Sequence, residues 1–276
     1  SIVMVYRWHC RQCDYTVWSP DRTATADAIK SHLLDHYRNN LSKDDFRVSW
    51  QCPYCDRTSQ GYDADESVDR FRNHLFEHVS SLLESGKHVA DTIDRAGDVL
   101  VLAPVESTGA DNARVHFTAP AEIAVFVTTN PARRVRLLDD QLQSWPAWTT
   151  ILTTKSQPFA DVTDIDLESA PLDVAIVDKG ISMTDLGETI SRVLDEQSTD
   201  DTRVTVGFDI LSELLQLFDT QTVFKFIHVL NTRLENMDAL THYYLDPSSQ
   251  PPSTVNVLKE LFDLKIRANG SVFETV

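Results

Sequence analysis

One metal-ligand pattern occurs twice near the start of this 276-residue chain. Each copy contains a tryptophan, two cysteines separated by two residues, and two histidines separated by three residues. The eight candidate ligands are Cys10, Cys13, His32 and His36 in the first copy, and Cys52, Cys55, His74 and His78 in the second. Equivalent ligands lie 42 residues apart in all four cases, which indicates a duplicated structural unit. The chain has no other cysteine.

The residue types and their spacing predict one structural zinc ion in each copy, or two zinc ions per chain. Two cysteines on a tight turn present both sulfurs to one ion, and histidines four residues apart share one helical face. Four protein ligands leave no position open for water or substrate, so a catalytic zinc is not expected. The alternatives are two disulfides or four free buried thiols, and disulfides would require an oxidising compartment.

A helix is expected to follow each cysteine pair, with Thr25 and Ser67 as candidate N-caps. Apolar residues four apart predict a stripe on each helix that packs on a tryptophan. The stripes are Ile29 and Leu33, facing Trp8, and Phe71 and Leu75, facing Trp50. Residues 6–80 therefore resemble the family of zinc fingers with two cysteine and two histidine ligands. Here 18 residues separate the second cysteine from the first histidine, whereas about 12 are common in that family. The connection between hairpin and helix is enlarged.

The composition is strongly acidic. The formal net charge is −17, from 42 acidic and 25 basic residues, and only 8 of the basic residues are lysines. Such a surface resembles that of salt-adapted haloarchaeal proteins, and the alternative is an ordinary acidic protein. No apolar run approaches the roughly 20 residues that span a bilayer. The first ten residues show no signal-peptide pattern, so a cytoplasmic location is expected.

The sequence predicts three parts: a first finger at 1–43, a second finger with a connector helix at 44–90, and an α/β domain at 91–276. In the third part, short apolar runs alternate with helical patterns, which predicts a mainly parallel sheet covered by helices. Strands are expected at 99–102, 123–127, 150–152, 174–177, 204–208, 240–245 and 264–268. Helices are expected at 132–143, 185–197, 211–218, 221–236 and 254–262.

The order of these elements resembles a RecA/KaiC-type core. The resemblance is carried by the strand, loop and helix that begin at Asp98, by the apolar strand that ends at Asp209, by the helix at 221–236 and by the closing residues 261–266. In that family a loop after the first strand cradles phosphate, and an aspartate at a strand end orders the metal of the nucleotide. The resemblance places Asp209 at that position.

The segment at the position of the phosphate loop departs from the family's pattern. The pattern G-x-x-x-x-G-K-[ST] falls on residues 104–111, where only the second glycine, Gly109, is present. Ala110 replaces the lysine that reaches the phosphates, and Asp111 replaces the hydroxyl that holds magnesium. The domain is therefore expected to be non-hydrolysing, with no catalytic or cofactor-binding residue, similar to the inactive RecA-like domains fused to small modules in halophilic archaea. The alternative is a domain that still binds nucleotide or another small ligand at the carboxyl edge of the sheet.

Other candidate residues have ordinary structural interpretations. A polar cluster at one strand end predicts either a pocket or a strand cap, and consists of His242, Tyr243, Tyr244 and Asp246. His228 is expected to be packed among apolar residues of its helix. A basic cluster at a helix start, made of Arg133, Arg134 and Arg136, is expected to balance local charge.

The net charge of the two fingers does not favour binding to DNA. Residues 1–43 carry a net charge of +2 and residues 44–90 carry −4, whereas DNA affinity depends on neutralising phosphates. The positions at the helix starts form no base-reading pattern: Asp27, Ala28 and Lys30 in one finger, and Asp69, Arg70 and Arg72 in the other. The sequence favours a non-enzymatic adaptor or regulator whose fingers dock a protein partner, with the core as scaffold or homo-oligomerisation surface. The alternatives are a DNA-binding regulator and a nucleotide-binding switch.

Overall fold

The computed structural model of the protein describes residues 5–119, 122–180, 182–197 and 202–276. They form two compact units. The finger unit comprises residues 1–89 together with 271–275, and the α/β unit comprises residues 90–270 together with 276. Residues 271–275 therefore belong with the fingers, whereas the sequence assigned them to the α/β domain at 91–276.

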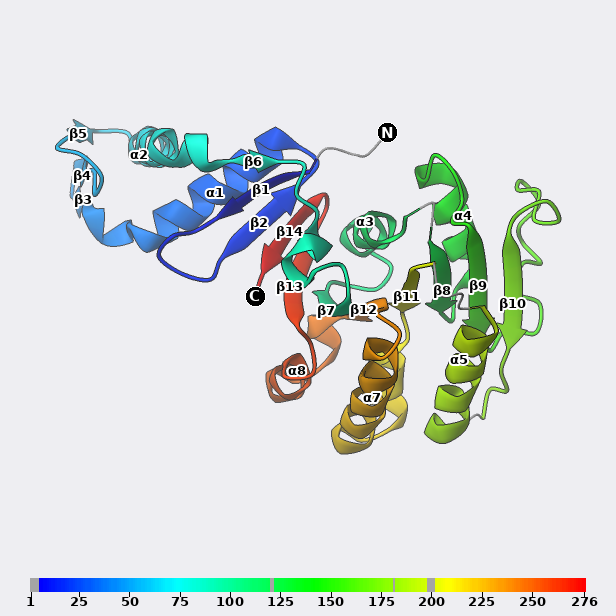
Figure 1. Ribbon diagram of the computed structural model, residues 1–276. Helices are drawn as coiled ribbons and strands as arrows, with labels where there is room; N and C mark the ends of the chain where they lie inside the picture. The colour runs from blue at the N-terminus through cyan, green and yellow to red at the C-terminus, as the bar shows by residue number, and fades with distance from the viewer. Residues whose placement is uncertain (1–4, 120–121, 181, 198–201) are drawn as a thin grey trace. The chain divides into compact units, whose positions relative to one another are not determined.

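The finger unit contains two equivalent series of elements (Figure 1). The first series is β1 (Tyr6–His9), β2 (Thr16–Ser19), α1 (Arg22–His36), a 3-10 helix (Arg38–Asn40) and β3 (Leu41–Asp44). The second series is β4 (Arg47–Gln51), β5 (Thr58–Gly61), α2 (Ala64–Val79), a 3-10 helix (Ser80–Leu82) and β6 (Glu84–Ser85). The C-terminal strand β14 (Val272–Thr275) completes the unit. The 42-residue repeat thus extends beyond the ligands to the whole hairpin, helix and trailing strand.

The two repeats exchange their trailing strands. Strand β3, which follows the helix of the first repeat, pairs with β4 of the second repeat. Strand β6, which follows the helix of the second repeat, pairs with β1 of the first. The registers are equivalent, because Arg7 lies opposite Glu84 and Ser49 lies opposite Ser42. The two fingers therefore form one interlocked body and are not two modules on a linker.

Both finger helices begin earlier than the sequence predicted. Asp21 caps α1 and Asp63 caps α2, and each carboxylate accepts hydrogen bonds from amides of the first turn. The predicted caps, Thr25 and Ser67, were wrong. They lie one turn inside the helices, where their hydroxyls donate to the backbone carbonyls of Asp21 and Asp63 at 2.9 and 2.7 Å. The free amides at a helix start need an acceptor at the residue that precedes the first turn, and the carboxylates of Asp21 and Asp63 supply it.

One hydrophobic core serves both fingers. It contains the predicted stripes and their tryptophans: Trp8, Ile29, Leu33, Trp50, Phe71 and Leu75. All six side chains are at most 4% exposed. A shared core means that the packing of one finger depends on the presence of the other.

The α/β unit is built on one sheet with the strand order β10-β9-β8-β11-β12-β7-β13. Its strands are β7 (Gly97–Leu102), β8 (Ile123–Val127), β9 (Trp148–Thr153), β10 (Leu172–Ile176), β11 (Val204–Phe208), β12 (Leu240–Leu245) and β13 (Leu264–Asn269). Every neighbouring pair in this order is parallel. After β7, the chain places β8 three positions away in the sheet, and β11 and β12 later fill the two positions between them.

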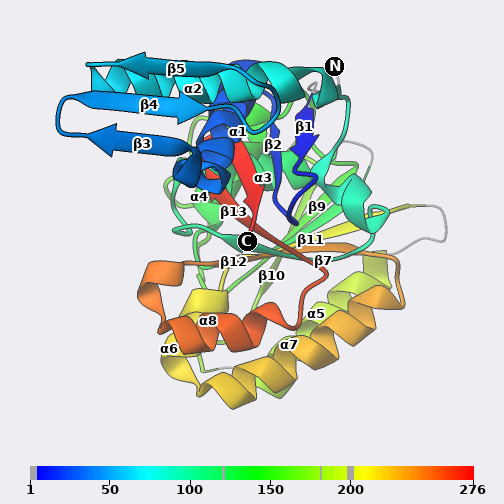
Figure 2. The same ribbon diagram turned by 90° about the vertical axis from the view of Figure 1, so that its left-hand side faces the viewer.

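Helices cover both faces of this sheet (Figure 2). One face carries α3 (Thr108–Phe117) and α4 (Pro131–Gln141), and the other carries α5 (Met183–Gln197), α6 (Leu211–Leu217), α7 (Thr220–Glu235) and α8 (Pro252–Lys259). Short 3-10 helices occur at Val89–Ile93, in place of the expected connector helix, and at Pro247–Ser249. The predicted fold class is confirmed in its architecture, with two N-terminal finger repeats followed by a mainly parallel sheet covered by helices. Within the described residues, no helix is long and apolar enough to cross a membrane.

Candidate functional site

The first ligand group comes from one turn and one helix. Cys10 and Cys13 lie in the turn between β1 and β2, and His32 and His36 lie on consecutive turns of α1. The sulfur of Cys13 is 3.5 Å from His32 Nε2 and 3.3 Å from His36 Nε2, and the sulfur of Cys10 is 3.7 Å from His36 Nε2. The sequence repeat and the fold therefore bring the same four side chains together.

The second group repeats this geometry. The sulfur of Cys52 is 3.5 Å from His78 Nε2, and that of Cys55 is 3.4 Å from His74 Nε2. The two Nε2 atoms are 3.3 Å apart. Each set of four ligand atoms lies within 4.8 Å of one another.

These distances can be compared with those around a tetrahedral ion. Metal–sulfur and metal–nitrogen bonds of about 2.3 and 2.05 Å place sulfur about 3.6 Å from nitrogen and two nitrogens about 3.3 Å apart. The observed separations of 3.3–3.7 Å and 3.3 Å agree with that geometry. Both groups could therefore hold a metal ion in a closed tetrahedral site.

The surroundings of the cysteine ligands affect whether they are thiols or thiolates. The thiols are free, so the structure does not contain the disulfides of the alternative reading. Backbone amides of Gln12 and Tyr54 donate to the sulfurs of Cys10 and Cys52 at 3.5 and 3.4 Å. Burial raises the pKa of both of these thiols, so a cation is needed to hold them as thiolates at neutral pH.

Neighbouring side chains hold the histidine rings in place. Tyr15 stacks on His32 with ring centroids 3.8 Å apart, and Trp50 stacks on His74 at 5.5 Å. His74 Nδ1 is 3.3 Å from a carboxylate oxygen of Glu77. Such outer contacts orient a ligating imidazole and leave its other nitrogen for the metal.

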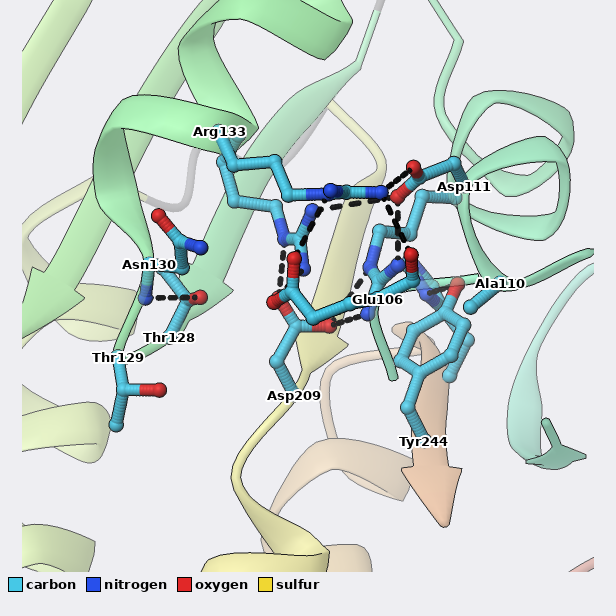
Figure 3. Close-up of polar contacts among 12 residues, drawn as sticks. Glu106, Ala110, Asp111, Thr128, Thr129, Asn130, Arg133, Asp209 and Tyr244 are labelled. Carbon is cyan, nitrogen blue, oxygen red and sulfur yellow. Dashed lines mark hydrogen bonds and ion pairs between the residues drawn. The ribbon is translucent and has the colours of Figure 1, made fainter. Parts of the chain in front are cut away.

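A second polar cluster lies at the carboxyl edge of the parallel sheet, where Asp209 follows β11 (Figure 3). Its two carboxylate oxygens accept one guanidinium each: Arg114 Nε donates at 2.8 Å and Arg134 Nε at 2.5 Å. Both arginine side chains are 1% exposed and the aspartate is 2% exposed. The two arginines outweigh the effect of burial and lower the pKa of Asp209 to about 2. Asp209 is therefore an ionised partner of two arginines, and its oxygens are occupied by them.

The remaining charges of the cluster are also paired. Asp111 accepts from Arg114 at 2.9 Å and from Arg133, and Glu106 pairs with Arg133 at 2.9 Å. Arg114 also lies over the ring of Tyr244, 4.1 Å from its centroid. The expectation that the basic cluster balances local charge is confirmed, and Arg136 contributes by contacting the carboxylate of Asp164 at 3.8 Å.

The segment aligned with the phosphate loop serves packing. Ser107 caps α3 by accepting from the amide of Ala110. Gly109 lies against β13, so that a Cβ atom placed there would be 2.4 Å from the carbonyl oxygen of Ala268. Gly109 is thus required for the close approach of α3 to β13. The amide of Ala110 is already hydrogen-bonded to Ser107.

The polar residues at the end of β12 are buried and not part of an open pocket. His242, Tyr243 and Tyr244 are fully buried. His242 Nδ1 lies 2.8 Å from Tyr244 Oη, and burial lowers the pKa of His242 to about 3, so the imidazole is neutral. Tyr243 Oη donates to Asn231 Oδ1 at 2.6 Å. The cluster is a hydrogen-bonded part of the core.

Two further expectations differ from the structure. Asp246 caps the 3-10 helix after β12, where its carboxylate accepts from the amide of Ser248. His228 is exposed on α7, so the expectation of a packed histidine was wrong. The buried side of that helix turn is formed by its neighbours Ile227 and Leu230.

The carboxyl edge, where the sequence left a ligand site open as an alternative, also contains a hollow. It measures about 470 Å³ and lies beyond the ends of β8 and β9. Its lining combines apolar side chains with seven polar ones, which are Thr128, Thr129, Thr153, Thr154, Lys179, Ser182 and Glu213. Burial raises the pKa of Glu213.

Residues 96–268 match the model of a family of unknown function, DUF7504. The chain belongs to this family. No curated protein matches it.

Solved structures that resemble the chain include the following three. PH0250 from Pyrococcus horikoshii OT3 has 8% identity and a TM-score of 0.43, covering 67% of this chain and 89% of the other. The uncharacterized P. horikoshii protein PH0321, solved in complex with an unknown peptide, has 8% identity and a TM-score of 0.41, covering 62% and 77%. Flagellar accessory protein FlaH from Methanocaldococcus jannaschii has 13% identity and a TM-score of 0.38, covering 67% and 82%.

Proposed function

We propose that the protein is a non-enzymatic, zinc-dependent docking platform, in which the finger unit binds a protein partner and the α/β unit serves as its scaffold. The observation that carries the proposal is the strand exchange between the two fingers. Strand β3 pairs with β4, β6 pairs with β1, and the two fingers share one core. Both metal groups would therefore stabilise one continuous body, and this body presents a single surface to a partner.

Zinc is the proposed ion at both groups. Two thiolates and two imidazoles in a closed tetrahedral set suit zinc, and four protein ligands give the ion a structural role. Its binding free energy would contribute directly to the folding of a unit with so small a core.

Charge pairing on the finger helices favours a protein partner over DNA. Three basic side chains within the finger helices are each matched by an acidic one on the same helix: Lys30 by Asp27, Arg70 by Glu66, and Arg72 by Asp69. Lys30 also lies over the ring of Phe76, so it connects the two helices. Binding to DNA depends on cations that are free to neutralise phosphates.

The absence of an enzymatic role is proposed from the carboxyl edge. A nucleotide needs free backbone amides and a lysine after the first strand, and a carboxylate that reaches its magnesium. Here the carboxylate of Asp209 is bonded by two arginines, and Ala110 and Asp111 stand at the lysine and hydroxyl positions. We extend the proposal to a salt-adapted protein on the grounds of its acidic composition.

Two measurements on the full chain test the proposal against its alternatives. Immobilised protein should retain a specific partner from an extract of its source cells, and should lose it when Cys52→Ala and Cys55→Ala remove two ligands. A gel shift with DNA at high potassium should be absent. A gel shift that Arg70→Ala and Arg72→Ala abolish, in a chain that keeps its metal content, would refute the adaptor in favour of a DNA-binding regulator. A melting temperature raised by millimolar ATP would instead support the nucleotide switch.

A further inference from the structure

The two finger hairpins differ in the covering of their outer edges. In the first finger, β14 from the end of the chain pairs with β2, with Phe273 opposite Trp18 and Glu274 opposite Val17. In the second finger, β5 is the last strand of the sheet β3-β4-β5, and no strand of the described residues pairs with its outer edge. All four residues of β2 are buried, whereas none of the four residues of β5 is.

The structure shows how a strand is held at the covered edge. Tyr15 Oη donates to Glu274 Oε1 at 2.6 Å, and the amide of Thr16 donates to Thr275 Oγ1 at 2.8 Å. The hydroxyl of Thr275 in turn donates to the carbonyl oxygen of Asp14 at 3.0 Å. Two backbone groups of the first finger, together with one side chain, thus anchor the added strand.

The same backbone groups are present at the open edge. Strands β4 and β5 pair in the same register as β1 and β2, since Ser49 lies opposite Gln60 where Arg7 lies opposite Trp18. Amide directions alternate along an antiparallel pair. Because the amide of Thr16 points away from β1 to β14, the equivalent amides of Thr58 and Gln60 point away from β4.

The side chains at the open edge indicate which strand would fit. Arg57 is exposed and occupies the position of Tyr15, so a carboxylate placed as in Glu274 would meet a guanidinium. The outward face next to this edge holds a groove of about 580 Å³ lined mainly by uncharged polar residues, including Ser42, Ser49, Gln51 and Gln60. A strand that pairs with the open edge of β5 would therefore fit best with an acidic side chain on one face and an uncharged polar side chain on the other.

We infer that the outer edge of β5 binds an extended segment of a protein partner, which adds as an antiparallel strand and places a carboxylate beside Arg57. The first finger, closed in the same way by β14, is the internal template for this mode. Main-chain hydrogen bonds to an exposed sheet edge supply the affinity, and alternate side chains supply the specificity. This inference rests on the proposed docking function and specifies what the partner offers, which is an extended segment that carries an acidic side chain.

The probe is a fluorescent peptide with the sequence of residues 270–276 carrying Phe273→Gln, since Gln60 replaces Trp18 at the open edge. Fluorescence anisotropy with the full, metal-loaded chain should show saturable binding. Gln60→Pro removes one outward amide and leaves the pairing with β4 in place, because proline is tolerated where the N–H faces out of a sheet edge. It should weaken binding about tenfold or more, as expected for one or two lost hydrogen bonds together with a steric clash.

The control is Gln60→Ala, which keeps the amide and should bind the peptide as the wild type does. A peptide with Glu274→Lys should bind at least about tenfold more weakly, because it places a cation beside Arg57. If Gln60→Pro lowers the metal content, Thr58→Pro replaces it as the test. Equal binding of the peptide to the wild type and the proline variant, or no binding at millimolar concentration, would overturn the inference.

Two outcomes separate this inference from the function on which it rests. A cellular partner that is retained equally by the wild type and by Gln60→Pro would leave the docking function in place and reject β5 as its site. Concentration-dependent dimers that Gln60→Pro abolishes, seen by sedimentation velocity, would show that a second copy of the chain occupies the edge and would reject a foreign partner there.

Discussion

The pairing of Asp209 with two buried arginines predicts a large loss of stability in Asp209→Asn. The substitution keeps the size of the side chain and removes its charge, so that Arg114 and Arg134, both 1% exposed, lose their shared counterion. Removing one partner of a buried ion pair costs about 3–5 kcal/mol. The lowered pKa of Asp209, about 2 against 3.8, corresponds to about 2 kcal/mol in favour of the ionised form and agrees in sign.

The assay is calorimetric or urea unfolding of the full chain, observed at the transition of the α/β unit. At about 2–4 °C for each kcal/mol in a domain of this size, the melting temperature should fall by about 6–20 °C. The exposed Asp178 supplies the control, since Asp178→Asn should change stability by less than about 0.5 kcal/mol.

The result also distinguishes two roles for Asp209. If this carboxylate were kept to bind the metal of a nucleotide, its neutralisation would relieve repulsion and leave the fold as stable or more stable. A loss below about 1 kcal/mol in Asp209→Asn would therefore refute the structural role given to the cluster. Acid should act in the same direction as the substitution: the stabilisation is present above pH 4 and is lost as the pH falls through about 2.

Metal analysis should find two zinc ions per chain, and Cys52→Ala should weaken the retention of both ions, because one core joins the fingers; loss of one ion with normal affinity for the other would contradict the shared core. Asp98 is 2% exposed, and burial, followed by Asp263, raises its pKa to about 7. The native state then holds a proton that the unfolded chain releases, so stability should fall as the pH rises from about 4 to 7. Asp98→Asn should flatten that slope in urea titrations and stabilise the protein by about 2–4 kcal/mol at pH 8. Gly109→Ala should cost about 1–3 kcal/mol by overpacking α3 on β13, while Gly180→Ala, where no atom lies within 4 Å of the added Cβ, should be nearly neutral in the same assay.

The sequence was sufficient for the strands of the parallel sheet and for the ligand groups. Runs such as 123–127 and 204–208 are apolar on both faces, which is typical of central parallel strands, and the structure begins and ends β8 and β11 at those residues. The ligand groups were predictable because both elements of each group, a cysteine turn and a helical histidine pair, have local spacing.

Features that depend on distant partners were not predictable. Strand β14 has only four residues and pairs with β2, whose residues precede it by more than 250 positions. The resemblance implied a helix after the first strand and its loop, but the bounds of α3 were not predicted, because Thr108–Phe117 is short and polar and its first residues were aligned with the phosphate loop. Arg114 lies in that helix and is separated from Asp209 by 95 residues, so no local pattern connects them.

The exchanged strands have a consequence for the order in which the protein is made. The hairpin of β1 and β2 is synthesised before the second hairpin, yet β6 reaches its edge only after residue 85 has been added, and β14 covers its other edge only after residue 275 has been added. The second hairpin, in contrast, has its neighbour β3 from the moment it is made. On the ribosome, the later finger therefore completes its sheet before the earlier one. Until residue 85 has been added, both edges of the two-stranded hairpin next to Cys10 and Cys13 are unpaired, and such a hairpin is only marginally stable by itself.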